Sequence, residues 1–149
     1  MKVEKVDHIH IYVKDLDKAI RFFSEVLGTK FTVPGEGGEG NEELEFTEAM
    51  DPLGLELVAP TSPDGVVGRA VERRGEGLAG LSLKVPNIEE ATAEMESRGI
   101  RVVSRIQAPG IKEVQFHPRD CHGVMIELTE YEEQPACVAA ALIARQRQT

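Results

Sequence analysis

Apolar and polar residues alternate most clearly between Val6 and Val13, where the chain reads V-D-H-I-H-I-Y-V. Alternation of this kind predicts an extended strand with two different sides. The apolar side carries Ile9, Ile11 and Val13. The polar side carries His8, His10 and Tyr12. We interpret this segment as a strand with its apolar side on a core and its two imidazoles lining a polar cavity.

A copy of this pattern lies between Leu78 and Val85, in L-A-G-L-S-L-K-V. Its apolar side carries Leu81, Leu83 and Val85. Its other side carries Gly80, Ser82 and Lys84. The copy has no histidine, and Gly80 stands where the first strand has His8.

Residues 15–28 have the three-and-four spacing of an amphipathic helix. Asp15 is a typical N-terminal cap, and Gly28 suits the left-handed position after a helix. The predicted buried face consists of Leu16, Ala19, Ile20, Phe23 and Leu27. Two further helices are predicted at residues 67–74 and 89–98. Further strands are predicted at residues 30–33, 42–47, 53–59, 101–105, 113–117 and 124–129.

Two segments fall outside this plan. Residues 34–41, P-G-E-G-G-E-G-N, are too rich in glycine and acid to pack, which predicts a mobile loop. Residues 136–147 are rich in alanine and predict an added helix for packing or dimerisation.

The order of the elements repeats along the chain. His8 and Gly80 are 72 residues apart, and the pairs Gly28 and Gly99, and Glu56 and Glu127, are each 71 apart. We therefore predict an α+β fold with a duplicated strand-helix-strand-strand-strand module. The predicted boundaries are 1–75 for the first module, 76–134 for the second and 135–149 for the tail.

Composition narrows the class of protein. The 149 residues carry a net charge of −9, which disfavours nucleic acid and anionic membranes as partners. No apolar run approaches the roughly 20 residues of a transmembrane helix, and the first residues lack the apolar core of a signal peptide. Two cysteines cannot form a framework of several disulfides. We expect a soluble cytoplasmic protein that binds a small molecule.

The candidate chemistry centres on His8, Glu56 and Glu127. Each glutamate interrupts an apolar strand, and two carboxylates on one cavity repel each other unless something neutralises them. A divalent cation would do so, and mixed nitrogen and oxygen ligands suit Co²⁺, Ni²⁺, Mn²⁺, Fe²⁺ or Zn²⁺. A raised carboxylate pKa, or a salt bridge to Lys84 or Arg119, is the alternative.

Three other histidines are candidates for substrate contact or for a metal. His10 shares the side of His8, roughly 6.5–7 Å further along the strand. His117 shares its side with Gln115. His122 lies in a turn with Cys121, where an exposed position is the simpler interpretation.

The segment D-H-I-H-I-Y-V-K-D-L-D-K-A-I-R-F-F-S-E-V-L-G resembles the opening of the vicinal oxygen chelate superfamily, which includes glyoxalase I, extradiol dioxygenases and bleomycin-resistance proteins. The segments R-G-E-G-L-A-G-L-S-L-K-V and F-H-P-R-D-C-H-G-V-M-I-E-L resemble the methylmalonyl-CoA epimerase branch. The resemblance implies paired βαβββ modules that form a cupped mixed sheet around a cleft, a divalent metal in that cleft, and a homodimer. Its metal ligands fall on His8, Glu56, Gly80 and Glu127, of which Gly80 cannot ligate.

The resemblance implies proton transfer next to a carbonyl. The expected enzyme is a metal-dependent epimerase or glyoxalase-like lyase for a small acyl thioester or oxo-acid, with His8, Glu56 and Glu127 as ligands and His10 and His117 as catalytic groups. One alternative is a metal-free binding or resistance-type protein, because a glycine at position 80 would widen the cleft. Another is a metal enzyme whose missing ligand comes from His10, His117 or His122.

Overall fold

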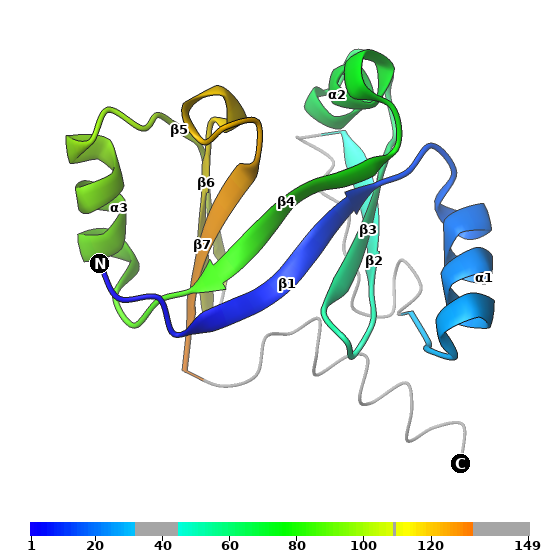
Figure 1. The fold of residues 1–149 in the computed structure, drawn as a ribbon, viewed down its shortest axis with the longest axis horizontal. Helices are drawn as coiled ribbons and strands as arrows, with labels where there is room; N and C mark the ends of the chain where they lie inside the picture. Colours follow the sequence, from blue (N-terminus) through cyan, green and yellow to red (C-terminus); the bar gives the residue numbers. More distant parts are fainter. Residues whose placement is uncertain (32–44, 109, 133–149) are drawn as a thin grey trace. The chain divides into compact units, whose positions relative to one another are not determined.

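The computed structural model describes residues 1–31, 45–108 and 110–132 (Figure 1). These residues form two compact units. The first unit joins Met1–Ile9 to Ala79–Pro135, and the second unit contains His10–Leu78. The first strand, β1 (Lys5–Tyr12), begins in the first unit and continues into the second. The predicted tail helix and the glycine-rich loop lie outside the described residues.

The strands follow the hydrogen-bonded order β2-β3-β1-β4-β7-β6-β5. Their bounds are β2 (Phe46–Met50), β3 (Leu55–Pro60), β4 (Gly77–Lys84), β5 (Val102–Ala108), β6 (Ile111–Phe116) and β7 (Met125–Tyr131). Strand β4 pairs with β7 in parallel, while β2–β3, β5–β6 and β6–β7 are antiparallel. The described helices are α1 (Leu16–Leu27), α2 (Val66–Arg74) and α3 (Ile88–Ser97), with a 3₁₀ turn at Pro118–Asp120. The predicted α+β class with a mixed sheet is confirmed.

In the second unit, α1 packs on β2 and β3 (Figure 1). Asp15 caps the helix by accepting a hydrogen bond from the Lys18 amide, and Gly28 adopts the left-handed conformation with φ +64°. The core beneath α1 contains Val13, Leu16, Phe31, Ala49, Leu57 and Ala59, with Ala19, Ile20 and Phe23 packed against it. The predicted inclusion of Leu27 in the buried face is wrong, since this last helical residue is exposed.

In the first unit, α3 packs on β6 and β7 (Figure 1). Asn87 caps it by accepting a hydrogen bond from the Glu90 amide. The core beneath α3 consists of Val85, Ile88, Ala91, Met95, Val114, Phe116 and Leu128. This core lies on one side of the strands, which leaves the alternate residues of β6 and β7 on the other side.

The sequence repeat corresponds to a structural repeat. β1 and β4 have the same order of exposed, intermediate and buried residues along all eight positions. The caps Asp15 and Asn87 occupy matching places, each binding the amide three residues later. The pattern of these two strands therefore reflects two similar burial environments rather than chance similarity of composition.

The two sides of β1 differ from the sequence-based interpretation. His8 and His10 are 5% and 3% exposed, whereas Ile9 and Ile11 are only partly buried. In β4 the same inversion places Gly80 and Ser82 in the buried class and leaves Leu81 and Leu83 intermediate. The histidine side of β1 is therefore the more enclosed one, which raises the demand for polar partners.

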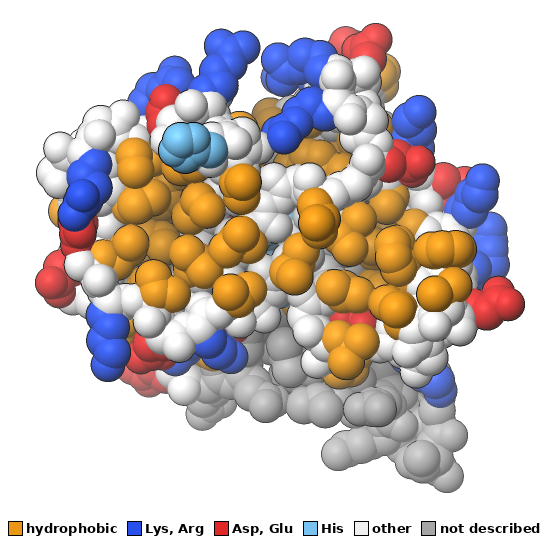
Figure 2. Space-filling model, in the orientation of Figure 1, with side chains coloured by type: hydrophobic (Ala, Val, Ile, Leu, Met, Phe, Trp, Pro, Cys, Tyr) orange, Lys and Arg blue, Asp and Glu red, His pale blue; other side chains and the backbone are white. Residues whose placement is uncertain are grey.

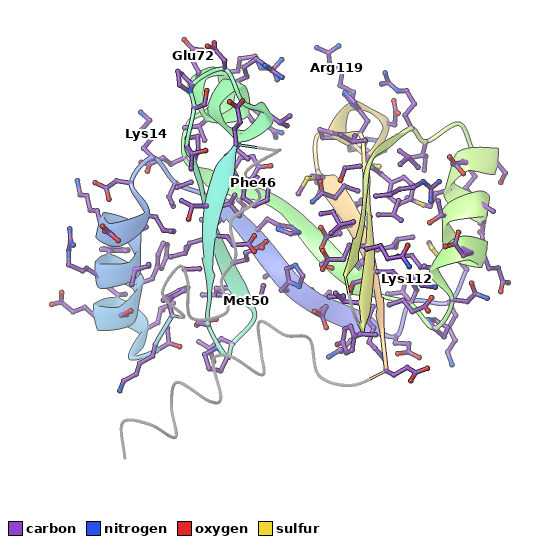
Figure 3. The ribbon with its side chains drawn as sticks, turned by 180° about the vertical axis from the view of Figure 1, so that it is seen from behind. Lys14, Phe46, Met50, Glu72, Lys112 and Arg119 are labelled. Atoms are coloured by element: carbon purple, nitrogen blue, oxygen red, sulfur yellow. The ribbon has the colours of Figure 1, made fainter. Side chains whose placement is uncertain are left out.

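Several element bounds also differ. Lys30 and Phe31 are in no regular structure, so the predicted strand at 30–33 is not formed by its described residues. Strand β2 begins at Phe46 and reaches Met50, the two residues that Figure 3 labels at its ends. Strand β7 continues to Tyr131, two residues beyond the predicted bound. Hydrogen-bonded pairing to a neighbouring strand decides these ends, and such pairing is not local in sequence.

Apolar side chains also reach the surface (Figure 2), among them Phe22 and Val26 on α1, Leu53 before β3 and Leu78 in β4. Figure 2 shows hydrophobic side chains gathered in groups over much of the face in view, rather than singly. Among the described residues, no helix has both the length and the apolar character needed to cross a membrane.

A surface ion pair supports the turn before β7. The Arg101 guanidinium donates to both carboxylate oxygens of Asp120, at 2.8 and 2.9 Å, and the Arg101 amide also donates to Asp120. These hydrogen bonds hold the pKa of Asp120 at about 2. A bidentate pair of this geometry ties the start of β5 to the 3₁₀ turn.

We expect the Asp120→Asn variant to show a flatter dependence of stability on pH below pH 4. The folded pKa of about 2 lies below the unfolded value of about 3.9. The ion pair therefore stabilises the protein above pH 4, and this contribution is lost as the pH falls towards 2. Urea unfolding at pH 2.5, 4 and 6 measures it. Arg101→Gln and the double variant complete the cycle, and equal pH slopes in all four proteins would contradict the assignment.

Candidate metal and proton-transfer site

Two predicted ligands meet in the first unit. His8 lies on β1 and Glu127 on β7, and both side chains are almost fully buried. Nε2 of His8 is 3.3 Å from Oε1 of Glu127. An imidazole nitrogen and a carboxylate oxygen at this separation are a suitable pair of donors for one divalent ion.

Asp7 contacts Nδ1 of His8, the ring nitrogen that does not face Glu127. Its Oδ2 is 3.0 Å from Nδ1 of His8, its Oδ1 accepts a hydrogen bond from the Tyr131 hydroxyl, and the Lys5 ammonium is 3.3 Å from the same Oδ1. Burial raises the pKa of Asp7, but the hydrogen bonds from His8, Tyr131 and Lys5 outweigh it and hold the pKa at about 2. An ionised carboxylate only accepts hydrogen bonds, so Nδ1 of His8 carries a proton.

Two lysine side chains hold the ring of Tyr131. The ammonium groups of Lys84 and Lys5 lie 4.9 and 5.7 Å from its centroid, within the range of cation–π attraction. Lys84 also pairs with Glu4 at 2.7 Å. Burial and the bond to Asp7 raise the pKa of the Tyr131 hydroxyl, which therefore remains a donor at neutral pH.

Glu127 is oriented from the opposite direction. Nε2 of Gln115 on β6 donates to Oε2 of Glu127 at 2.9 Å, and Oγ of Ser104 on β5 donates to Oε1 of Gln115 at 3.1 Å. Strand register explains this row, since Gln115 pairs with both Glu127 and Ser104. Ser82 pairs with Glu127 from β4. Gln115 thus holds the Glu127 carboxylate directly, and Ser104 holds Gln115 in turn.

The other two predicted residues meet in the second unit. Glu56 lies on β3, and its Oε2 contacts Nδ1 of His10 on β1. His10 is 3% exposed and Glu56 is 7% exposed. A carboxylate that accepts from Nδ1 fixes the ring of a histidine, as is common for both metal-binding and proton-transferring imidazoles.

Position 80 is not an open space. A Cβ atom on Gly80 would lie 2.3 Å from the carbonyl oxygen of Met125 and 2.8 Å from its Cβ. These atoms belong to β7, which pairs with β4 at this residue. The prediction that Gly80 widens the cavity is wrong, because the glycine allows two strands to approach closely.

The remaining candidates, His117 and His122, lie in and beside the turn before β7. His117 precedes the 3₁₀ turn, and its Nδ1 accepts a hydrogen bond from the Arg119 amide. His122 is exposed in the following turn with φ +55°, as the simpler interpretation predicted. Arg119 extends away from the turn (Figure 3). The catalytic role of His117 stays a prediction.

Sequence reasoning missed Asp7, Tyr131 and Ser104 as parts of this site. Strict alternation places Asp7 on the side of β1 opposite His8, which concealed their contact. Tyr131 is 124 residues away in sequence from Asp7. Ser104 and Gln115 share a register that only β-pairing reveals.

The donor set fits a divalent metal. His8 and Glu127 belong to a group of buried side chains able to hold an ion, whose third member is His10, two residues along the same strand. The two central residues already have their orienting partners, Asp7 for the imidazole and Gln115 for the carboxylate. Metal-ligating residues are typically supported in this way.

Fold and sequence together define the class of protein. The chain belongs to the Glyoxalase/Bleomycin resistance protein/Dioxygenase superfamily, whose model matches residues 7–116. Its relatives include epimerases and a lyase, and the chain is an enzyme of this epimerase or lyase type.

Three relatives make the likeness concrete. Mitochondrial methylmalonyl-CoA epimerase of Bos taurus is 28% identical over 130 residues, which cover 85% of this chain and 74% of that protein. Lactoylglutathione lyase of Schizosaccharomyces pombe is 29% identical and covers 89% of this chain but 49% of its own length. A solved structure of a Streptomyces coelicolor methylmalonyl-CoA epimerase variant, in complex with 2-nitronate-propionyl-CoA, superposes with a TM-score of 0.76 and 28% identity, covering 89% of this chain and all of that one.

Proposed function

We propose that this protein is a metal-dependent epimerase that moves a proton next to the carbonyl of a small acyl-CoA thioester of the methylmalonyl-CoA type. The observation that carries this proposal is the buried pair of His8 and Glu127, 3.3 Å apart, with an orienting partner on each side. The likeness to methylmalonyl-CoA epimerases over most of the chain supports the choice of substrate.

The proposed metal ligands are His8, Glu56 and Glu127. A divalent ion, with Co²⁺, Ni²⁺, Mn²⁺, Fe²⁺ and Zn²⁺ as the candidates, would supply a positive centre that stabilises negative charge on the substrate oxygens. Asp7 keeps a proton on Nδ1 of His8, so Nε2 is the nitrogen that would bind the ion. Gln115 donates to one oxygen of Glu127 and leaves the other directed towards His8.

His10 is the proposed proton-transferring group. Its contact with Glu56 orients the ring, and its near-complete burial keeps bulk water away from the imidazole. Histidine is the side chain that most often acts as a general acid or base in enzymes. We also propose His117 as a second catalytic group. Its Nδ1 accepts a hydrogen bond from the Arg119 amide, and this bond must break before the nitrogen can take part in proton transfer.

A second role for His10 follows from the same geometry. Because Gly80 offers no ligand atom, and a side chain there would press on Met125, His10 is the candidate to supply the missing ligand. The His10→Ala variant separates the two roles. A metal content equal to that of the unmodified protein with activity lost identifies a proton-transferring group, whereas loss of the metal identifies a ligand.

The proposal is tested on protein purified without chelator. We expect about one equivalent of divalent metal by elemental analysis, and exchange of the C2 proton of methylmalonyl-CoA for deuterium in D₂O, followed by NMR. Removal of the metal with EDTA should abolish this exchange, and Co²⁺ or Mn²⁺ should restore it. Protein without bound metal and without exchange after metal addition would refute the proposal.

We also propose that the protein acts as a homodimer in the cytoplasm and takes no nucleic acid or membrane partner. The net charge of −9 supports the last two points. Light scattering at micromolar concentration measures the oligomeric state, and a monomer of 16.4 kDa would contradict the dimer.

A further inference from the structure

We infer that Asp7, held by Tyr131, is the positioning residue that selects the tautomer of His8 and thereby makes its Nε2 able to bind a metal. Nothing in the family likeness assigns this role. The inference rests on the proposed function where it concerns the metal, but the tautomer of His8 is a property of the protein without metal.

The contacts at Asp7 divide between its two oxygens. Oδ2 faces Nδ1 of His8 at 3.0 Å. Oδ1 receives the Tyr131 hydroxyl and lies 3.3 Å from the Lys5 ammonium. The side chain of Asp7 is 5% exposed, so water does not substitute for these partners. Oδ2 of Asp7 therefore accepts the hydrogen bond from the imidazole, and Oδ1 holds the carboxylate in place through Tyr131 and Lys5.

The consequence for His8 follows from the chemistry of imidazole. A neutral ring has one protonated and one unprotonated nitrogen. With Nδ1 protonated, it is Nε2, 3.3 Å from Glu127, that gives up a proton when a cation binds and offers that cation a lone pair. With the proton on Nε2, the ring would instead donate to Glu127 and could not bind a cation through that nitrogen.

The anchor at Oδ1 makes a sharp prediction for Asp7→Asn. The Tyr131 hydroxyl and the Lys5 ammonium are both donors, so they select the amide oxygen of the asparagine for their side. The amide NH₂ is then directed at Nδ1 of His8 and donates to it. The variant should therefore hold His8 in the opposite tautomer, with almost no change in side-chain shape.

The experiment is ¹⁵N NMR of the imidazoles in protein freed of metal at pH 7.5, followed by competition titration with Co²⁺. In Asp7→Asn we expect Nδ1 of His8 to change from a protonated to an unprotonated chemical shift, with the ring proton on Nε2. We expect the affinity for Co²⁺ to fall about 10–100-fold, as is typical when the partner of a ligating histidine is lost. Asp120→Asn is the matched control, the same change at an ion pair on the surface of the same unit, and should alter neither readout.

An unchanged His8 tautomer in folded Asp7→Asn overturns the inference, whether or not the enzyme is active. If Asp7→Asn does not fold, Tyr131→Phe decides. It removes the anchor and keeps the carboxylate, so the tautomer should stay and the Co²⁺ affinity should fall several-fold, whereas unchanged affinity overturns the role. Failure of the proposed function gives a different result from failure of this inference. If only the proposed function fails, the unmodified protein binds no Co²⁺, yet the His8 proton still moves from Nδ1 to Nε2 in Asp7→Asn.

Discussion

Replacing Gly80 with alanine is expected to lower the free energy of unfolding by about 1–3 kcal/mol, the usual cost of overpacking a closely packed position. The new Cβ would lie 2.3 Å from the carbonyl oxygen of Met125, and backbone atoms cannot yield as a flexible side chain can. Strands β4 and β7 would have to separate where they pair. Urea denaturation followed by circular dichroism measures the loss.

Ser82→Ala is the control for this experiment. Ser82 lies on the same strand and the same side, is fully buried, and its hydroxyl has no hydrogen-bond partner among the described residues. Removing that oxygen should change the stability by less than about 1 kcal/mol, since the hydroxyl makes no bond to lose. A Gly80→Ala protein as stable as Ser82→Ala would show that the two strands do not pack as closely as the structure has them.

The same close approach bears on the missing ligand. Gly80→His would restore the residue that the family resemblance places at this position, yet its side chain would start from the same obstructed Cβ. We expect this variant to be destabilised at least as much as Gly80→Ala and to gain no metal affinity. A tightened metal site in Gly80→His would contradict the packing argument.

Removing either central ligand is expected to have the largest effect on metal binding. In His8→Ala or Glu127→Gln the affinity for Co²⁺ should fall by more than about 100-fold, beyond the 10–100-fold typical of supporting residues. Proton exchange at C2 of methylmalonyl-CoA should fall with it. Glu127→Gln is the informative variant, because its amide oxygen still accepts the hydrogen bond from Gln115 while the charge is lost.

Glu89→Gln provides the matched control, since it removes one carboxylate charge from the exposed first turn of α3. Its metal affinity and activity should equal those of the unmodified protein. Thermal unfolding should accompany each assay, because burial of an altered polar network costs about 1–3 kcal/mol. A folded Glu127→Gln protein with unaltered affinity would exclude Glu127 as a ligand.

Much of the fold could be predicted from local signals. The capped helix α1 begins and ends at the predicted residues because Asp15 and Gly28 act within one turn of it. The matching burial of β1 and β4 follows from a repeat that is visible in spacing alone. The burial of Glu56 and Glu127 was expected from charged residues inside apolar strands.

Local signals could not identify the residues that orient His8 and Glu127. Alternation assigns Asp7 to the wrong side of β1, and its partner Tyr131 belongs to a strand that ends two residues later than predicted. The pairing of Gln115 with Glu127 depends on the register between β6 and β7, which residue types alone do not fix.

The sequence by itself indicated the family, through the resemblance of its motifs. Local periodicity and spacing indicated the duplicated module and the residue types available for metal binding and proton transfer. Only the tertiary structure decided that His8 meets Glu127, that Asp7 orients His8, and that Gly80 is closed by Met125. The physical reason is that the contacts of His8 with Glu127, of Gly80 with Met125, and of Asp7 with its anchor Tyr131 each join strands distant in sequence. Register and backbone separation, not residue type, set which atoms meet there.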